Sequence, residues 1–207
     1  MCIRDSSNAV EIDELDILTA ISRDGESLYA AMLDCTLRFP GGETARRCIV
    51  LRGGAVVIVP VLWCTETREA YTLMVRQRRI VDGNYTLEFP AGMIQLKEGK
   101  SDPFSSALVE VKEELGIDLK EEELKKLTDE PLRVCESLLD EKVHFFYFER
   151  HVSQLYLSKV NMLDTGCHDD GEFTQVVVQK LNEVKKNPNF VSLIGLKLIE
   201  LELDLIF

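Results

Sequence analysis

The segment from Ala55 to Trp63 constrains the fold of this chain most strongly, because it is a nearly continuous run of Val and Ile. A strand with one solvent-exposed face alternates apolar and polar residues, whereas a continuous apolar run is typical of a strand buried on both faces. Ala70–Arg76 follows as its predicted hairpin partner. The chain therefore needs a sheet that other elements cover on both sides.

A helix is predicted near the middle of the chain. Asp102 and Pro103 supply an N-cap and a first helical residue, and Gly116 supplies a stop, so the helix should run from Pro103 to about Leu115. The remaining patterns predict strands at Ser27–Leu37, Arg47–Arg52, Arg133–Leu138, Val143–Phe148 and Phe173–Gln179, and helices at Leu181–Lys186 and Val191–Leu205. This order predicts an α/β fold in which helices cover both faces of a mixed sheet.

Three carboxylates share one face of the predicted helix, since Glu110, Glu113 and Glu114 are spaced by three and four residues. Like charges at this spacing destabilise a helix, so the cluster needs a compensating charge. A hard divalent cation with oxygen ligands, such as Mg²⁺ or Mn²⁺, would supply it. The alternative is an ordinary solvated acidic face.

The residues around these glutamates resemble the Nudix box, in which a glycine and a glutamate precede a helix carrying R-E-hydrophobic-x-E-E-x-G-hydrophobic. The positions that fit are Gly92, Glu98, Glu110, Val111, Glu113, Glu114, Gly116 and Ile117. Two features depart from the family pattern. Ten residues instead of seven separate Glu98 from the helix motif, and Val109 occupies the position of the family's arginine.

Four further segments are similar to the ADP-ribose and ADP-sugar pyrophosphatase branch of the Nudix hydrolases: LRGGAVVIVPVL before the box, RQRR at 76–79, EFPAGM at 88–93 and GCHDDGEF at 166–173. The resemblance implies a Nudix-type α/β/α sandwich over residues 54–207. It also implies a short N-terminal β extension over residues 7–53, which helps to form a homodimer in this branch. Residues 1–6 are similar to the translation of a sequencing adapter, and we interpret them as an artefact.

The resemblance implies roles for individual residues. Glu110 and Glu114 match the positions that hold catalytic Mg²⁺, Glu113 matches a further ligand or outer-shell partner, and the carbonyl of Ala91 matches a backbone ligand. Glu98 is expected in the second shell, although an exposed loop carboxylate is the alternative.

A catalytic carboxylate is also expected outside the helix. Glu172 matches the loop glutamate that acts near the attacking water, as base or metal ligand. Asp169 or Asp170 could substitute for it, and His168 lies beside it in the sequence. The alternative is a polar surface loop without a catalytic role.

Substrate contacts are expected upstream of the box. Gln77 and Arg79 match branch positions that bind substrate, and a planar guanidinium suits a diphosphate. Arg76 and Arg78 are interpreted as solvent-exposed charges, and Gly92 as the glycine that the loop before the helix needs. Val109 cannot donate a hydrogen bond to the glutamates, which predicts a slower enzyme or one that needs more metal.

The resemblance implies a Mg²⁺-dependent pyrophosphatase that cleaves a nucleoside diphosphate sugar, of the ADP-ribose or ADP-glucose type, to a nucleoside monophosphate and a sugar phosphate. Mn²⁺ could replace Mg²⁺. One alternative is a Nudix-fold protein that binds nucleotide sugars without efficient catalysis, and another is a UDP-sugar pyrophosphatase.

Composition excludes several other classes of protein. The net charge of −12 argues against a nucleic-acid polymer as partner, and no apolar run is long enough to span a bilayer. The six cysteines show no CxxC spacing, which favours reduced thiols, and three scattered histidines make a zinc site improbable. We expect a cytoplasmic protein without a membrane partner, although organellar targeting stays open.

Overall fold

The computed structural model describes residues 10–22, 28–79, 81, 83–94, 96–97, 100–167 and 173–206. These residues divide into two compact units. One contains the described residues up to Gly54 together with Leu132–Lys142, and the other contains Ala55–Pro131 and the described residues from Val143 onward. Assigning the first unit as a β extension and the second as a Nudix domain stays a prediction.

The first unit is an antiparallel sheet of three strands in the order β1-β2-β3. Their bounds are β1 (Glu11–Ser22), β2 (Leu28–Arg38) and β3 (Thr44–Leu51). The two strands predicted in this region are confirmed as β2 and β3, with a turn in which Gly42 has a φ of +89°. Strand β1 was not predicted. The core of this unit is small, with Ala31, Leu33 and Cys35 buried.

The predicted strand at Arg133–Leu138 is wrong. Only β11 (Leu132–Arg133) is extended, and a turn follows in which the N–H groups of Leu138 and Leu139 both donate to the carbonyl of Cys135. These local hydrogen bonds occupy donors that a strand would direct toward a neighbour.

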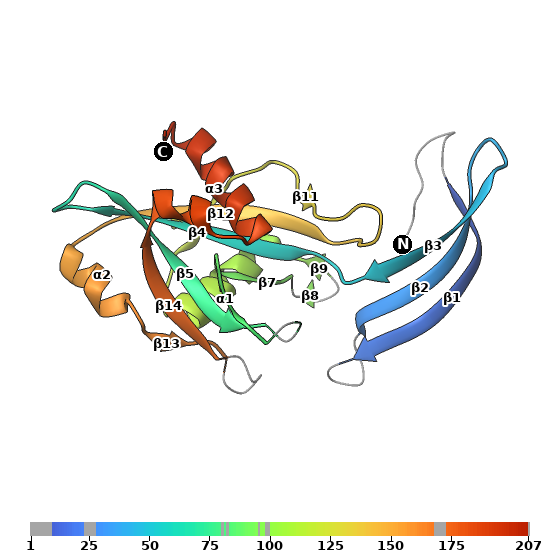
Figure 1. Ribbon diagram of the computed structural model, residues 1–207, viewed down its shortest axis with the longest axis horizontal. Coiled ribbons are helices and arrows are strands. Elements are labelled where there is room, and N and C mark those ends of the chain that lie inside the picture. The colour runs from blue at the N-terminus through green and yellow to red at the C-terminus, as the bar shows by residue number, and fades with distance from the viewer. Residues whose placement is uncertain are drawn as a thin grey trace. The chain divides into compact units, whose positions relative to one another are not determined.

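The second unit contains a mixed sheet built on the buried strand predicted from the sequence (Figure 1). Its strands follow the order β10-β12-β4-β5-β14-β13, with β6 beside β5 and β7 beside β4. The bounds are β4 (Ala55–Cys64), β5 (Ala70–Arg78), β6 (Tyr85–Glu88), β7 (Ala91–Met93), β10 (Lys125–Lys126), β12 (Lys142–Val152), β13 (Asp164–Thr165) and β14 (Thr174–Lys180). Because β12 runs parallel to β4 while β5 runs antiparallel to it, the prediction of a mixed sheet is confirmed.

Helix α1 (Pro103–Leu115) has the bounds that its capping residues predict. The Asp102 carboxylate accepts hydrogen bonds from the N–H groups of Phe104 and Ser105, and Gly116 ends the helix with a φ of +66°. The other elements are the short strands β8 (Leu96–Lys97) and β9 (Lys100–Ser101), the helices α2 (Gln154–Val160) and α3 (Phe190–Glu202), and the 3₁₀ helices η1 (Glu121–Glu123) and η3 (Leu181–Lys186). Helix α2 was not predicted, and the segment at 181–186 is 3₁₀ rather than α.

The two long helices cover opposite faces of the sheet (Figure 1). Val56, Ile58 and Leu62 of β4 share one hydrophobic cluster with the buried residues of α1. Side chains alternate between faces along a strand. Accordingly, Val59 of β4 lies against Gly195 of α3. The expectation of helices on both faces is confirmed, and β4 is buried on both.

Candidate active site

Among the described glutamates of the predicted site, Glu114 is the most deeply buried, with only 5% of its surface exposed. Its Oε2 accepts a hydrogen bond of 2.9 Å from the backbone N–H of Ala91 in β7. A buried carboxylate is costly unless hydrogen bonds or opposite charges compensate it. The structure therefore places the last turn of α1 directly against the Pro90-Ala91-Gly92 segment, as the resemblance implies.

Glu110 lies one helical turn before Glu114 and contacts the next residue of the same strand. A Cβ atom built on Gly92 would overlap the carboxylate of Glu110. Glycine matters at this position for a steric reason: a larger residue would displace the carboxylate from the place that it takes beside the backbone. Glu110 and Glu114 thus contact consecutive residues of β7.

Glu113 differs from these two residues because it is exposed, although its backbone carbonyl accepts a hydrogen bond of 3.0 Å from the N–H of Gly166. Within the described part of the chain, no three His, Cys, Asp or Glu side chains are arranged to hold a metal ion. Two clustered carboxylates still fit Mg²⁺, which typically binds one or two carboxylates together with water and substrate phosphates. The chemistry of these two donors therefore suits a hard cation.

Several predicted residues lie outside the described ranges: Glu98, His168, Asp169, Asp170 and Glu172. Their roles stay predictions. Gly166 and Thr174, which stand near them in the sequence, are described. Gly166 lies close to α1, and Thr174 lies beside Gln77 on β5.

Arg79 is part of an ion pair on the same face of the sheet. Its Nε and Nη2 donate to the two carboxylate oxygens of Glu88 at 2.8 and 2.5 Å, and the hydroxyl of Thr86 donates to the same carboxylate at 2.6 Å. Burial raises the pKa of Glu88, but the hydrogen bonds from Arg79 and Thr86 and the positive charge of Arg79 outweigh it, so the net pKa is lowered. Glu88 was not singled out from the sequence, although it stands beside the Phe89-Pro90 turn.

Gln77 lies on β5, where it is paired with Thr86 of β6 on one side and Thr174 of β14 on the other. Val75, two residues earlier, belongs to the α1 cluster. Strand alternation therefore puts Gln77 on the α1 face of the sheet. Arg76 and Arg78 belong to the other face, where their guanidinium groups lie 4.3 and 4.9 Å from the ring centroid of Tyr85.

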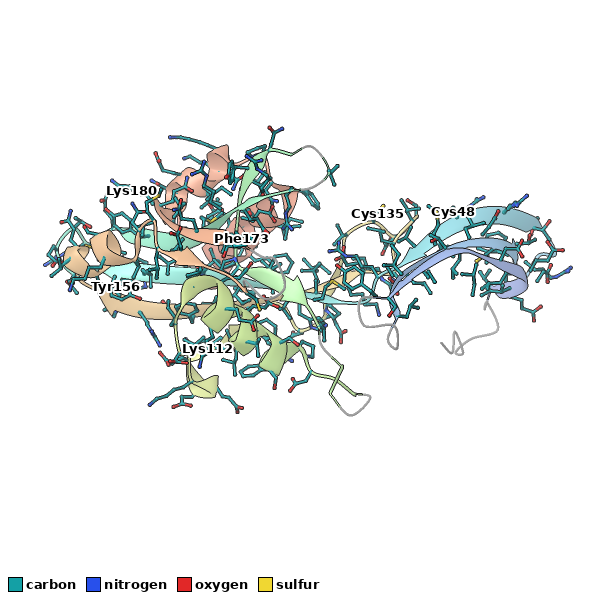
Figure 2. The ribbon with its side chains drawn as sticks, turned by 90° about the horizontal axis from the view of Figure 1, so that it is seen from below. Cys48, Lys112, Cys135, Tyr156, Phe173 and Lys180 are labelled. Atoms are coloured by element: carbon teal, nitrogen blue, oxygen red, sulfur yellow. The ribbon has the colours of Figure 1, made fainter. Side chains whose placement is uncertain are left out.

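Val109 is half-buried on α1. Lys112, the nearest cation along the helix, is exposed (Figure 2). It forms a 2.8 Å ion pair with Asp118. Lys112 therefore does not replace the arginine that the family has at position 109.

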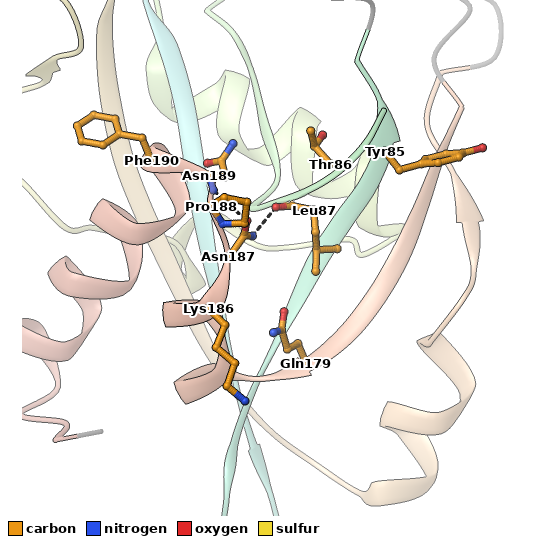
Figure 3. Close-up of a pocket in the computed structure, with 9 residues that line it drawn as sticks. All are labelled: Tyr85, Thr86, Leu87, Gln179, Lys186, Asn187, Pro188, Asn189 and Phe190. Carbon is orange, nitrogen blue, oxygen red and sulfur yellow. Dashed lines mark hydrogen bonds between the residues drawn. The ribbon is translucent and has the colours of Figure 1, made fainter. Parts of the chain in front are cut away.

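A shallow pocket of about 620 Å³ lies on the opposite face of the sheet (Figure 3). Its lining comes from β6, the end of β14, η3 and the start of α3, and consists of Tyr85, Thr86, Leu87, Gln179, Lys186, Asn187, Pro188, Asn189 and Phe190. Two of these residues are joined directly, since the side-chain amide of Asn187 donates a hydrogen bond to the Leu87 carbonyl. None of the predicted catalytic or metal-binding residues lines this pocket, so the candidate site is the α1 face and not the pocket.

No family model matches the chain. It is 31% identical over 142 residues to "Nudix hydrolase 14, chloroplastic" from Arabidopsis thaliana, an alignment that covers 65% of this chain and 45% of that protein. The chain thus spans less than half the length of this relative.

Its fold resembles that of a solved structure described as "Crystal structure of ADP compounds hydrolase", with a TM-score of 0.67, 18% sequence identity and coverage of 97% of both chains. At this identity the likeness shows the fold. None of the helices within the described ranges is long and apolar enough to cross a membrane.

Proposed function

We propose that the chain is a Nudix hydrolase, since it is 31% identical over 142 residues to a protein of that name, and that it hydrolyses the diphosphate bond of a nucleoside diphosphate sugar. The products would be a nucleoside monophosphate and a sugar phosphate. An ADP-sugar such as ADP-ribose or ADP-glucose is the preferred substrate class. The name of the structural neighbour, an ADP compounds hydrolase, supports this choice.

The observation that carries the proposal is the contact of Glu110 and Glu114 with consecutive residues of β7. Two carboxylates that face one glycine-containing strand offer oxygen ligands to a divalent cation, and we propose Mg²⁺, with Mn²⁺ as a substitute. Glu110, Glu114 and the Ala91 carbonyl would hold it, with Glu113 as an outer ligand and Glu98 in the second shell. Bound there, the cation would neutralise phosphate charge and lower the pKa of a water molecule.

The residues of this chain would then orient the substrate and move its protons. The N–H of Ala91 holds the Glu114 carboxylate in one orientation, so this side chain does not need to reorganise on binding. Arg79 would contact the diphosphate, and its Nε and Nη2 donate to the carboxylate of Glu88. Glu172 would accept the proton of the attacking water.

The presence of Val109 favours an enzyme with weakened activity. Valine leaves the box carboxylates without the charged partner that the family pattern has, so we propose that half-maximal activity needs more metal than in a protein with arginine. Substituting Val109→Arg should lower that metal concentration several-fold in a titration of initial rates with Mg²⁺. An unchanged titration would show that position 109 does not control the metal requirement.

The test of the function is incubation of the purified protein with Mg²⁺ and a panel of ADP- and UDP-sugars, with Glu114→Gln as the control. Release of the nucleoside monophosphate should be lost by more than about 100-fold in Glu114→Gln, since even outer partners of a metal ligand are worth 10- to 100-fold. Cleavage of UDP-sugars alone would correct the base. Binding by calorimetry without cleavage, in Mn²⁺ as well as Mg²⁺, would support the nucleotide-sugar binding protein instead.

We also propose a homodimer that uses the first unit. Strand β1 lies at the edge of its sheet and exposes Ile17, Leu18 and Ile21 by more than half of their surface. An apolar edge strand is usually covered by a partner. Light scattering coupled to size-exclusion chromatography should give twice the mass of the chain, and Ile17→Lys should reduce it to the mass of the monomer. Cytoplasmic localisation stays a prediction, and the Arabidopsis relative is named as chloroplastic.

A further inference from the structure

A pair of threonine hydroxyls joins the β13–β14 hairpin to the last turn of α1. The hydroxyl of Thr165 donates to the backbone carbonyl of Glu114 at 2.8 Å, and it lies 3.0 Å from the hydroxyl of Thr174. A threonine hydroxyl has a single proton. Since Thr165 donates its proton to Glu114, Thr174 must be the donor to Thr165. The hydrogen bonds therefore run in one direction, from Thr174 through Thr165 to Glu114.

The hairpin also satisfies the preceding carbonyl of the helix. The N–H of Gly166 donates to the carbonyl of Glu113 at 3.0 Å, whereas the carbonyls of Lys112 and Val111 accept from Gly116 and Ile117 directly after the helix. The last carbonyls of a helix have no partner within the helix itself. Here two of them are satisfied by the chain that follows the helix and two by a hairpin that begins fifty residues later.

Glu114 is consequently held through both its side chain and its backbone. Its carboxylate accepts from Ala91 of β7, and its carbonyl accepts from Thr165 of β13. On the other side, Thr174 is 5% exposed and pairs with Gln77 of β5. The base of the hairpin is therefore tied to the helix with the proposed metal ligands and to the strand with a proposed substrate residue.

We propose that Thr165 is a positioning residue for the hydrolysis: it sets the location of the β13–β14 hairpin relative to the carboxylates of Glu110 and Glu114. The inference rests on the proposed function, because Glu172 belongs by sequence to the segment that joins Thr165 to Thr174. The reaction needs a base and a metal site at a fixed separation, and a displacement of about 1 Å can cost 10²-fold in rate. The hydroxyl of Thr165 would hold the described base of the hairpin, from which the segment with Glu172 continues in the sequence, against the last turn of α1.

Thr165→Val removes the hydroxyl while keeping the shape of the side chain. We expect kcat to fall by about 10- to 100-fold with little change in KM for the nucleoside diphosphate sugar. Thr165→Ser keeps the hydroxyl and should retain most of the activity. Thr174→Val should have a smaller effect than Thr165→Val, because Thr165 can still donate to Glu114.

A purely structural role would lower the melting temperature without lowering kcat. The matched control is Ser153→Ala, which removes the hydroxyl that caps α2 by accepting from the N–H of Tyr156. Both variants should lower the melting temperature, and only Thr165→Val should lower kcat. Equal retention of kcat in the two variants would overturn the proposal.

A double-mutant cycle tests whether Thr165 acts through the hairpin. If it does, Thr165→Val should cause little further loss of kcat in a Glu172→Gln background, since interacting residues are not additive. Fully additive losses, or a Glu172→Gln protein with wild-type kcat, would contradict the proposal.

Hydrogen exchange separates this inference from the proposed function. If the wild-type protein releases no nucleoside monophosphate from any sugar nucleotide, the proposed function fails. The role of Thr165 in holding the hairpin is still tested, because Thr165→Val should speed amide exchange in the peptide from Gly166 to Thr174 and leave exchange in α2 unchanged. Unchanged exchange in that peptide would refute the anchoring role whether or not the protein is an enzyme.

Discussion

Two glycines make room for a neighbouring side chain on the two faces of the same sheet, and the neighbours differ in chemistry. On the α1 face, Gly92 of β7 leaves space for the carboxylate of Glu110. On the α3 face, Gly195 lies 3.1 Å from the Phe89 ring and from Val59, measured from where its Cβ would stand. Phe89 and Gly92 are only three residues apart, so one short segment meets a charged group of α1 on one face and places its own aromatic ring against α3 on the other.

The comparison separates function from stability. Phe89 and Val59 are buried and apolar, and their contacts with α3 contribute by removing apolar surface from water. The group beside Gly92 is the carboxylate at the end of the flexible Glu110 side chain. Hydrophobic packing does not require a carboxylate beside a glycine. We infer that Gly195 serves the core and that Gly92 serves the site.

The largest expected effect of breaking this arrangement is that of Gly92→Ala on activity. The added methyl group would displace the Glu110 carboxylate, and we expect hydrolysis to fall by about 10- to 100-fold. The melting temperature should change little, because the displaced atoms belong to a flexible side chain. Steady-state rates and a thermal melt of the same preparation check both parts, and a large drop in melting temperature with normal kcat would reverse the comparison.

Gly195→Ala should have the opposite profile. Overpacking typically costs about 1–3 kcal/mol, and replacing a helical glycine by alanine returns about 1 kcal/mol, so we expect a net destabilisation of about 1 kcal/mol. The activity should be unchanged below the melting transition. Urea denaturation measures the free energy of unfolding, and a more stable variant would show that Phe89 can move aside.

The smallest expected effect is that of Thr86→Val on stability. Its dependence on pH distinguishes the α1 face of the sheet from the α3 face. Hydrogen bonds and the charge of Arg79 hold the pKa of Glu88 below its ordinary value of 4.5, so they stabilise the fold above about pH 4.5 and that stabilisation is lost as the pH falls through the lowered pKa. Removing the Thr86 hydroxyl should cost no more than about 1 kcal/mol at pH 7, because Arg79 remains and is partly exposed.

The difference between Thr86→Val and wild type should shrink at pH values below the lowered pKa, whereas the effect of Gly195→Ala should not depend on the ionisation of Glu88. Urea denaturation at several pH values measures both. A Thr86→Val effect that is constant with pH would show that its cause is packing rather than the carboxylate.

Sequence patterns predicted the elements whose signals are local. Asp102, Pro103 and Gly116 define α1 through their own backbone preferences, and the Val and Ile run of β4 needs no partner to be recognised. Strand β1 was missed because its residues are exposed along its whole length, so no alternation between a buried and a solvent face was available. The prediction of a strand at Arg133–Leu138 failed for a different reason, since a local turn satisfies the backbone there instead of a neighbouring strand.

The site shows the same limit. The glutamates of α1 and Gly92 could be predicted from their spacing and from the family resemblance, and the structure brings Glu110, Glu114, Ala91 and Gly92 together. The bond from Thr165 to Glu114 and the ion pair between Arg79 and Glu88 could not be predicted, because each depends on how separate segments meet in space. A threonine before a glycine is also too common a pattern to indicate a role.

The parallel pairing of β4 with β12 has a consequence for how the protein reaches its native state. Val143 pairs with Ala55, and the helix with the glutamates lies between the two strands in the sequence. Such distant pairing makes folding slow, because a long stretch of chain must be ordered before the contact forms. During synthesis, the edge of β4 that pairs with β12 therefore stays open until the chain beyond residue 143 has been made, and an unpaired apolar edge of this kind is prone to aggregate.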